Sequence, residues 1–139
     1  MAIERTLAII KPDAVAAGHV GGIVSMIESS GLRILGLQMR RLTLDQAKAF
    51  YAVHAQRPFF EGLVAFMTSG PVVVRVLEGD DAIAGWRTLM GPTDATKAGA
   101  GTVRGRFGKD VSRNAVHGSD ALATAALEIP FFFPACQLV

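Results

Sequence analysis

The sequence predicts an α+β fold of the ferredoxin-like type, in which four strands form a mainly antiparallel sheet covered by helices on one face. Three observations predict it. Apolar runs of strand length alternate with segments that carry apolar residues at helical spacing. Their order is a βαββαβ pattern with an inserted helical hairpin and one long insertion. No internal repeat or linker interrupts the chain, so residues 1–139 are expected to form a single domain.

The first part of the chain contains two predicted strands separated by a helix. Residues 3–10 form an apolar run that ends at Lys11-Pro12, because proline cannot donate to a strand ladder. Residues 20–27 place apolar side chains at i, i+3, i+4 and i+7, and Gly31 is the expected C-cap of this helix. Residues 34–42 form the second predicted strand. Leu35, Leu37 and Met39 are expected to share one face of this strand.

A helical hairpin and a central strand follow. Thr43-Leu-Asp-Gln46 is a capping box, which predicts a helix start. The apolar stripe of that helix consists of Ala47, Phe50, Tyr51 and His54. Pro58 suits the first position of the next helix, which carries Phe60, Leu63, Val64 and Met67. Residues 72–77 are almost entirely apolar, which is typical of a central strand.

The last part of the chain begins with a helix that Gly79-Asp80-Asp81 is expected to open. Residues 91–113 have no clear period, and a loop of this length in a compact domain is usually functional or disordered. Residues 115–117 form a short predicted strand. Ser119 or Asp120 is then expected to cap a final helix, followed by a tail from Pro130 onward.

Composition excludes several classes of protein. Half of the residues are apolar and 19% are charged, which excludes a disordered chain. The net charge of +2 is too small for a general nucleic-acid-binding surface. No run approaches the ~20 apolar residues of a membrane span, and no secretory signal is present. The single Cys136 cannot form an internal disulfide, so a cytoplasmic protein is expected.

The stretch Asn114-Ala-Val-His-Gly-Ser-Asp120 carries the strongest chemical signal. The imidazole of His117 is nucleophilic when unprotonated, and the N–H groups of a following helix start favour negative charge. Residues 97–113 add five Lys or Arg against one Asp. This combination suits accepting a phosphoryl group and passing it on. The alternative is a hydrogen-bonded structural histidine, which is the interpretation favoured for His19 and His54.

Four other side chains suit an anionic ligand with an aromatic base. Lys11 follows a strand end, and Arg87 and Arg104 offer the planar donor fork that matches phosphate oxygens. Phe59 beside Phe60 suggests that one ring packs inward while the other stacks on a base. The simpler alternatives are an exposed lysine at position 11, a surface arginine at position 87 whose stem covers apolar area, a solvated basic loop around Arg104, and two core phenylalanines. The chain has no G-x-x-x-x-G-K-[S/T] loop, no complete dinucleotide fingerprint and no zinc spacing.

Taken together, these stretches resemble the nucleoside diphosphate kinase family over nearly the full length of the chain. The matching segments are residues 4–15, 57–60, 69–71, 86–93, 101–105 and 114–120. The resemblance implies ping-pong transfer of a terminal phosphoryl group from a nucleoside triphosphate, usually ATP, to a nucleoside diphosphate. His117 is the implied phosphohistidine.

The resemblance also implies roles for eight further residues. The implied nucleotide contacts are Lys11, Phe59, Arg87, Thr93, Arg104 and Asn114. Tyr51 and Glu128 match supporting positions in catalysis, with Glu128 orienting the imidazole through its other nitrogen. The implied cofactor is Mg²⁺, held mainly by the nucleotide phosphates rather than by protein ligands.

This chain departs from the family pattern at two places. Ala95 and Ala100 stand where the family usually has prolines, so the long loop is expected to be less restrained. The helix after His117 is unusually apolar, which fits a homo-oligomer, tetramer or hexamer, in which another subunit covers it. Two further hypotheses remain open: a non-enzymatic protein that binds nucleotides or nucleic acid, and a phosphohistidine donor to other proteins.

Overall fold

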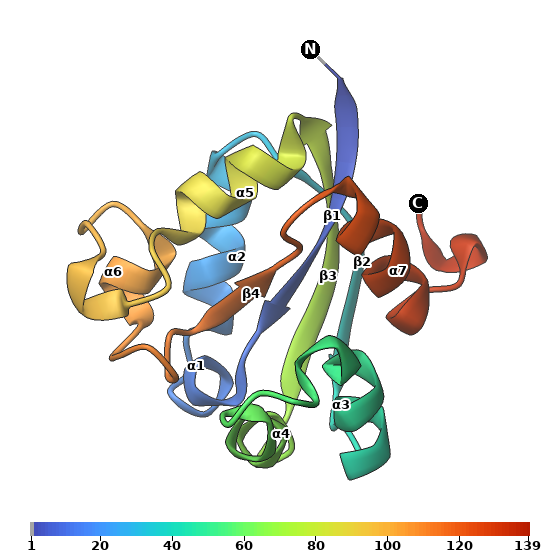
Figure 1. Ribbon diagram of the computed structural model, residues 1–139. Coiled ribbons are helices and arrows are strands. Elements are labelled where there is room, and N and C mark those ends of the chain that lie inside the picture. Colours follow the sequence, from blue (N-terminus) through green and yellow to red (C-terminus); the bar gives the residue numbers. More distant parts are fainter. Residues whose placement is uncertain (1) are drawn as a thin grey trace.

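The computed structural model describes residues 2–139 and contains a four-stranded antiparallel sheet (Figure 1). The strands are β1 (Ile3–Ile10), β2 (Arg33–Arg40), β3 (Val72–Asp80) and β4 (Val116–Gly118). They lie in the order β2-β3-β1-β4, and each neighbouring pair is antiparallel. This is the ferredoxin-like strand order, so the predicted fold class is confirmed.

Helices cover both faces of the sheet, which corrects the expectation of a single covered face. On one face lie α2 (Val20–Ser29) and α5 (Ala82–Met90). The other face is covered by α3 (Leu44–Phe50), α4 (Phe60–Met67) and α7 (Leu122–Phe132). The prediction was wrong because the inserted hairpin and the final helix bury their own apolar stripes against this second face. The short elements are α1 (Pro12–Ala16), α6 (Val103–Phe107), η1 (Ala52–His54), η2 (Ala95–Lys97) and η3 (Ala135–Gln137).

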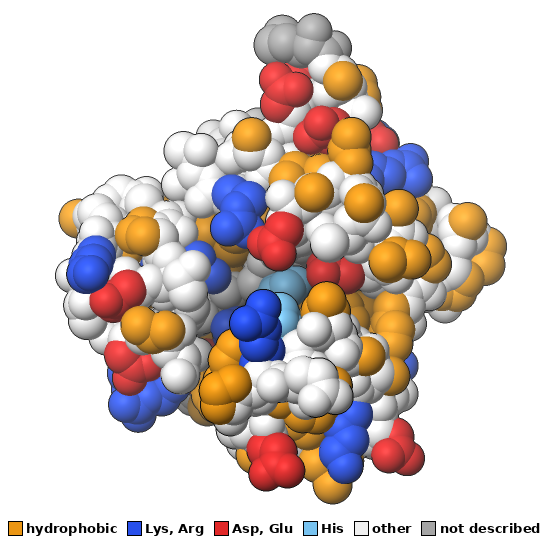
Figure 2. Space-filling view, viewed as in Figure 1, with side chains coloured by type: hydrophobic (Ala, Val, Ile, Leu, Met, Phe, Trp, Pro, Cys, Tyr) orange, Lys and Arg blue, Asp and Glu red, His pale blue; other side chains and the backbone are white. Residues whose placement is uncertain are grey.

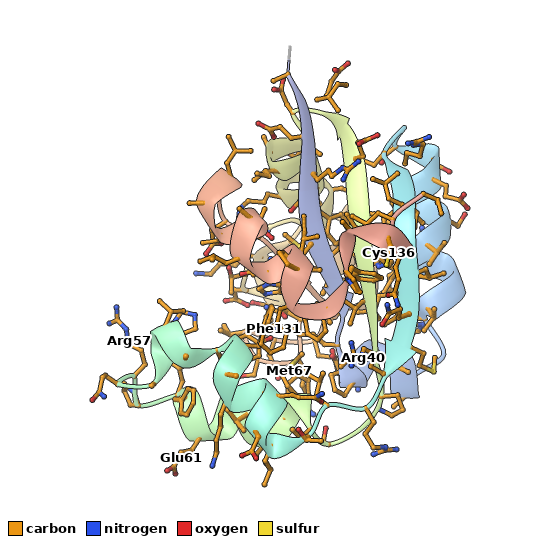
Figure 3. The ribbon with its side chains drawn as sticks, turned by 90° about the vertical axis from the view of Figure 1, so that its right-hand side faces the viewer. Arg40, Arg57, Glu61, Met67, Phe131 and Cys136 are labelled. Carbon is orange, nitrogen blue, oxygen red and sulfur yellow. The ribbon has the colours of Figure 1, made fainter. Side chains whose placement is uncertain are left out.

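Figure 3 views the molecule from the side of α7 and the α3–α4 hairpin. Phe131 and Met67 lie where the C-terminal end of α7 approaches the hairpin. Arg40 of β2 lies nearby, with its guanidinium carbon 5.5 Å from the centroid of the Phe132 ring. Arg57 and Glu61 lie at the outer edge of the hairpin, away from the sheet. Apolar side chains of the hairpin therefore pack toward the core, whereas Arg57 and Glu61 lie on its outer side.

Strand β2 contains a β-bulge that changes which residues face inward. Ile34 and Gly36 pair with consecutive residues of β3, so Leu35 is the extra residue. Leu35 is buried, whereas Leu37 and Met39 are 54% and 63% exposed. The expectation that these three residues share one face was wrong, because a shift of one residue moves every later side chain to the opposite face.

Of the two helix starts in the hairpin, that of α3 follows the predicted chemistry and that of α4 does not. The hydroxyl of Thr43 accepts a hydrogen bond from the N–H of Gln46, and the Gln46 side chain accepts one from the N–H of Thr43, so the capping box is confirmed. Helix α4 begins at Phe60, two residues later than the prediction based on Pro58, and Phe59 occupies its N-cap position.

The final helix differs from its prediction at both ends. Neither Ser119 nor Asp120 caps it, because the hydroxyl of Thr124 accepts from the N–H groups of Asp120 and Ala121. Its other end continues through Pro130 to Phe132. An interior proline costs about 3 kcal/mol, but extending the helix buries the Phe132 side chain in the core, which offsets much of that cost.

Further differences concern α5 and the long insertion. Helix α5 begins at Ala82, and the carboxylate of Glu4 from β1 accepts from the N–H of Ile83, so the cap comes from another strand rather than from Asp81. The insertion at 91–113 contains the short η2 and α6, which periodicity did not reveal. No helix within residues 2–139 combines the length and apolar character needed to cross a membrane.

Candidate functional site

A cavity of about 690 Å³ opens where β4 and α5 meet the 91–113 insertion and the α3–α4 hairpin. Figure 2 shows a hollow near the middle of this face, with histidine atoms inside it and Lys, Arg, Asp and Glu side chains around it. Of the nine site residues predicted from the sequence, all but Glu128 line the cavity: Lys11, Tyr51, Phe59, Arg87, Thr93, Arg104, Asn114 and His117. Glu128 reaches the site through its contact with His117.

Within residues 2–139, the imidazole of His117 is hydrogen-bonded through one nitrogen only. Its Nε2 lies 3.1 Å from Oε1 of Glu128, which also accepts a bond from the Ser119 hydroxyl at 2.9 Å. The same hydroxyl accepts from the N–H of Leu7 at 3.2 Å, so the buried Ser119 links β1 to the carboxylate. With Nε2–H donating to Glu128, the neutral ring leaves its Nδ1 lone pair free to act as a nucleophile.

Two aromatic rings of the hairpin pack edge-on against this imidazole. The ring centroids of Phe50 and Tyr51 lie 5.7 Å and 6.2 Å from that of His117. The hydroxyl of Tyr51 is buried and has no hydrogen-bond partner within residues 2–139. Burial, together with the negative charge of Glu128, raises the pKa of Tyr51. Tyr51 therefore stays protonated and can donate to a ligand oxygen.

Lys11 enters the cavity from the end of β1. Its Nζ donates to Oδ1 of Asn114 at 2.9 Å, and its N–H donates to the carbonyl of Ala115 at 2.8 Å. Burial, followed by the positive charge of Arg104, lowers the pKa of Lys11 to about 8, and the carboxylate of Asp13 opposes part of this shift. That carboxylate also accepts from the N–H of Ala115, whose φ is +73°, and so supports a strained turn beside the site.

The two arginines of the cavity differ in how many of their N–H donors already form hydrogen bonds within the protein. The guanidinium of Arg104 donates to the carbonyls of Gly91, Asn114 and Val116 at 3.0, 3.3 and 2.9 Å. A guanidinium has five N–H donors, so two remain for a ligand. Burial, followed by the charge of Arg87, lowers the pKa of Arg104 to about 10. Arg87 is more exposed and forms an ion pair with Asp120 at 2.9 Å.

The polar and aromatic walls complete the cavity. The Asn114 amide donates to the carbonyls of Thr93 and Val111, both at 3.0 Å, and thereby ties the insertion to β4. Phe59 is 52% exposed at the cavity edge, whereas Phe60 packs against the core. As the sequence suggested, the ring of Phe60 faces inward and the ring of Phe59 is available for stacking.

Local sequence reasoning missed three contributors to this site. Ser119 and Asp120 were interpreted as helix caps because both residue types favour caps. In the structure Ser119 instead donates a hydrogen bond to Glu128, and Asp120 pairs with Arg87. His54 was interpreted as structural, but it lines the cavity 5.4 Å from the ring of Phe59. No local pattern distinguishes these roles, because each depends on residues distant in the chain.

The charges in the cavity suit a polyanion better than a free metal ion. Lys11, Arg87 and Arg104 contribute three cationic side chains, against one lining carboxylate, that of Asp120. Within residues 2–139 there is no group of three or more His, Cys, Asp or Glu side chains placed to hold a metal. A histidine beside three cations and an exposed aromatic ring suits phosphoryl transfer from a nucleotide.

Comparison with known proteins supports this assignment. The family model described as "Nucleoside diphosphate kinase" matches residues 4–138. The chain belongs to the nucleoside diphosphate kinase family. It is 60% identical to the nucleoside diphosphate kinase of Acidiphilium cryptum (strain JF-5), covering 100% of this chain and 99% of that protein. The kinase of Thiobacillus denitrificans is 56% identical, covering 99% and 97% of the two chains.

Solved structures of nucleoside diphosphate kinases have the same fold. The Aquifex aeolicus enzyme superposes with a TM-score of 0.97 at 46% identity, covering 99% of this chain and 100% of that one. The Halobacterium salinarum enzyme, solved in complex with CDP, gives 0.95 at 44% identity, covering 99% and 92%. The predicted family, fold and enzyme class are therefore confirmed: the chain is a phosphotransferase that acts on nucleoside di- and triphosphates, and its reaction class uses a divalent metal ion.

Proposed function

We propose that Nδ1 of His117 is the atom that carries the phosphoryl group in this kinase. The observation that supports this most directly is the Nε2–Glu128 contact, because it leaves Nδ1 as the unprotonated ring nitrogen. Nδ1 attacks the terminal phosphorus of a nucleoside triphosphate, an N–P bond forms, and the P–O bond to the departing nucleoside diphosphate breaks. A second nucleoside diphosphate then takes the group by the reverse step.

The cationic side chains supply the charge stabilisation that the transfer needs. Lys11 and Arg104 are buried beside the nucleophile, and Arg87 can exchange Asp120 for a phosphate oxygen. Tyr51 is proposed to donate its free hydroxyl to the transferring group. Preorganised donors of this kind stabilise the developing charge without reorganising at the moment of reaction.

The nucleoside is proposed to bind between the hairpin and the insertion. Phe59 stacks on the base, which explains acceptance of different bases, because every base presents a π face. Thr93 and Asn114 lie on the opposite wall, in reach of phosphates and sugar hydroxyls. Mg²⁺ is the proposed metal, bound through the nucleotide phosphates, and when bound it neutralises charge on their oxygens.

Labelling in two half-reactions tests this proposal. Incubation with γ-labelled ATP and Mg²⁺, without acceptor, should give an acid-labile, base-stable label on the protein that later chases into GTP when GDP is added. His117→Ala should abolish the label. His54→Ala, which alters the same cavity without removing the proposed nucleophile, should retain it. A label that persists in His117→Ala would show that another residue is the nucleophile.

A homo-oligomer, tetramer or hexamer, in the cytoplasm is proposed as the working form. Exposed apolar side chains on α7 and β2 support assembly, since large apolar patches on a surface commonly mark interfaces. The lone Cys136 is exposed and free, as expected in a reducing compartment. Native mass spectrometry and cell fractionation test the two statements separately.

A further inference from the structure

Trp86 contacts the backbone of the residues that carry the chemistry. It is the only tryptophan of the chain and is fully buried in α5. Its Nε1–H donates to the carbonyl of His117 at 3.2 Å. A Cβ atom built on Gly118 would lie 2.6 Å from Cδ1 and 2.7 Å from Nε1 of the indole, so the ring edge packs directly against the Gly118 backbone.

The sheet provides the space in which this indole lies. Arg75, Ala8 and Gly118 are paired across β3, β1 and β4, so they form one row on one face of the sheet. Ala8 and Gly118 are the small members of this row, which lets the indole approach the sheet closely. A larger residue at position 118 would collide with Trp86 and with Met90.

Arg75 lies over the face of the Trp86 indole. Its guanidinium carbon lies 5.5 Å from the centroid of the Trp86 ring. The side chain is fully buried, and its three nitrogens have no hydrogen-bond partner within residues 2–139. The face of the Trp86 indole attracts a cation and so stabilises the buried charge of Arg75. The charge of Arg75 in turn favours one orientation of the indole ring.

We propose that Trp86 is a positioning residue for His117. Its N–H holds the His117 carbonyl and its ring edge blocks movement of Gly118, so the backbone of the nucleophile stays in place while the phosphoryl group arrives and leaves. The next residue along α5 is Arg87, which lines the cavity. Helix α5 therefore sets the separation between the nucleophile and one phosphate-binding cation. This inference rests on the proposed role of His117.

Replacement of the indole nitrogen alone tests the inference. Because Trp86 is the only tryptophan, growth of a tryptophan auxotroph on 3-benzothienylalanine replaces N–H by sulfur at this position only. Incorporation of 5-fluorotryptophan, which keeps the N–H, is the matched control. We expect the sulfur analogue to lower the rate constant of His117 labelling by γ-labelled ATP roughly fivefold to tenfold, with unchanged ADP affinity. The fluorinated protein should label at the normal rate.

In the analogue experiment, two outcomes would overturn the role of Trp86: an unchanged labelling rate in the sulfur analogue, or a loss of ADP affinity as large as the loss of rate. Absence of label in the unmodified protein would instead contradict the proposed function itself. A second measurement needs no substitution and so does not depend on correct folding of a variant. The single indole ¹H–¹⁵N resonance should move when His117 is phosphorylated, and an unmoved resonance would overturn the inference.

Discussion

At the scale of single residues, Lys11 is a buried cation whose charge changes near working pH. Burial lowers its pKa to about 8, so it is charged below pH 8 and becomes neutral as the pH rises above that value. We expect kcat/KM for ATP to fall as pH rises through about 8, because this ratio reports ionisations of the free enzyme. Lys11→Arg, which stays charged, should not show this fall. A flat wild-type profile between pH 7 and 10 would contradict the prediction.

Arg75 gives a second prediction, on stability. Burial lowers its pKa to about 9 from 12.5, so the folded protein carries the cost of the buried charge in full below pH 9, and the cost fades between pH 9 and 12.5. Arg75→Met should therefore raise the free energy of unfolding at pH 7 by about 1–4 kcal/mol, measured in urea, with a smaller gain above pH 9.

Arg57→Met is the control for this change. Arg57 is exposed at the outer edge of the hairpin, so its substitution should alter stability by less than about 0.5 kcal/mol. Destabilisation by Arg75→Met would mean that the stacking on Trp86 is worth more than the desolvation of the charge costs.

At the scale of elements, α7 carries a proline inside its last turns. Pro130 cannot donate to the carbonyl four residues earlier, yet the helix continues to Phe132. Pro130→Ala should restore that bond and raise the free energy of unfolding by about 1–3 kcal/mol. Pro134→Ala lies outside the helix and should give no such gain. Equal unfolding midpoints for the wild type and Pro130→Ala would refute this expectation.

At the scale of the whole molecule, the exposed apolar side chains predict how copies of the chain associate. Leu127 on α7 is 77% exposed, and α7 also exposes Leu122. Leu127→Lys should favour smaller species on dilution, measured by size-exclusion chromatography with light scattering, because a charge buried at an interface is costly. Val53→Lys is the matched control, since Val53 is 84% exposed but lies on η1. An unchanged mass for Leu127→Lys would exclude α7 from the contact.

Much of the site could be predicted from the sequence because its parts are local. The apolar run of β1 matched the observed strand at both ends, and the Thr43–Gln46 capping box needs only residues within one turn. The stretch around His117 places several functional side chains within seven consecutive residues. Together with Lys11 and Arg104, it was specific enough to indicate the family before any contact was known.

The tertiary structure decided what depends on distant partners. Glu128 reaches His117, Ser119 anchors Glu128 rather than capping a helix, and Trp86 holds the His117 carbonyl, each because packing brings separate elements together. The bulge at Leu35 and the helix that passes Pro130 likewise reflect burial against the sheet. Hydrophobic periodicity and helix caps act over one or two turns, so they cannot predict contacts between distant residues. The sequence by itself determined which chemical groups are present and to which family the chain belongs. The packed fold determined which nitrogen of His117 contacts Glu128 and which one faces away from it.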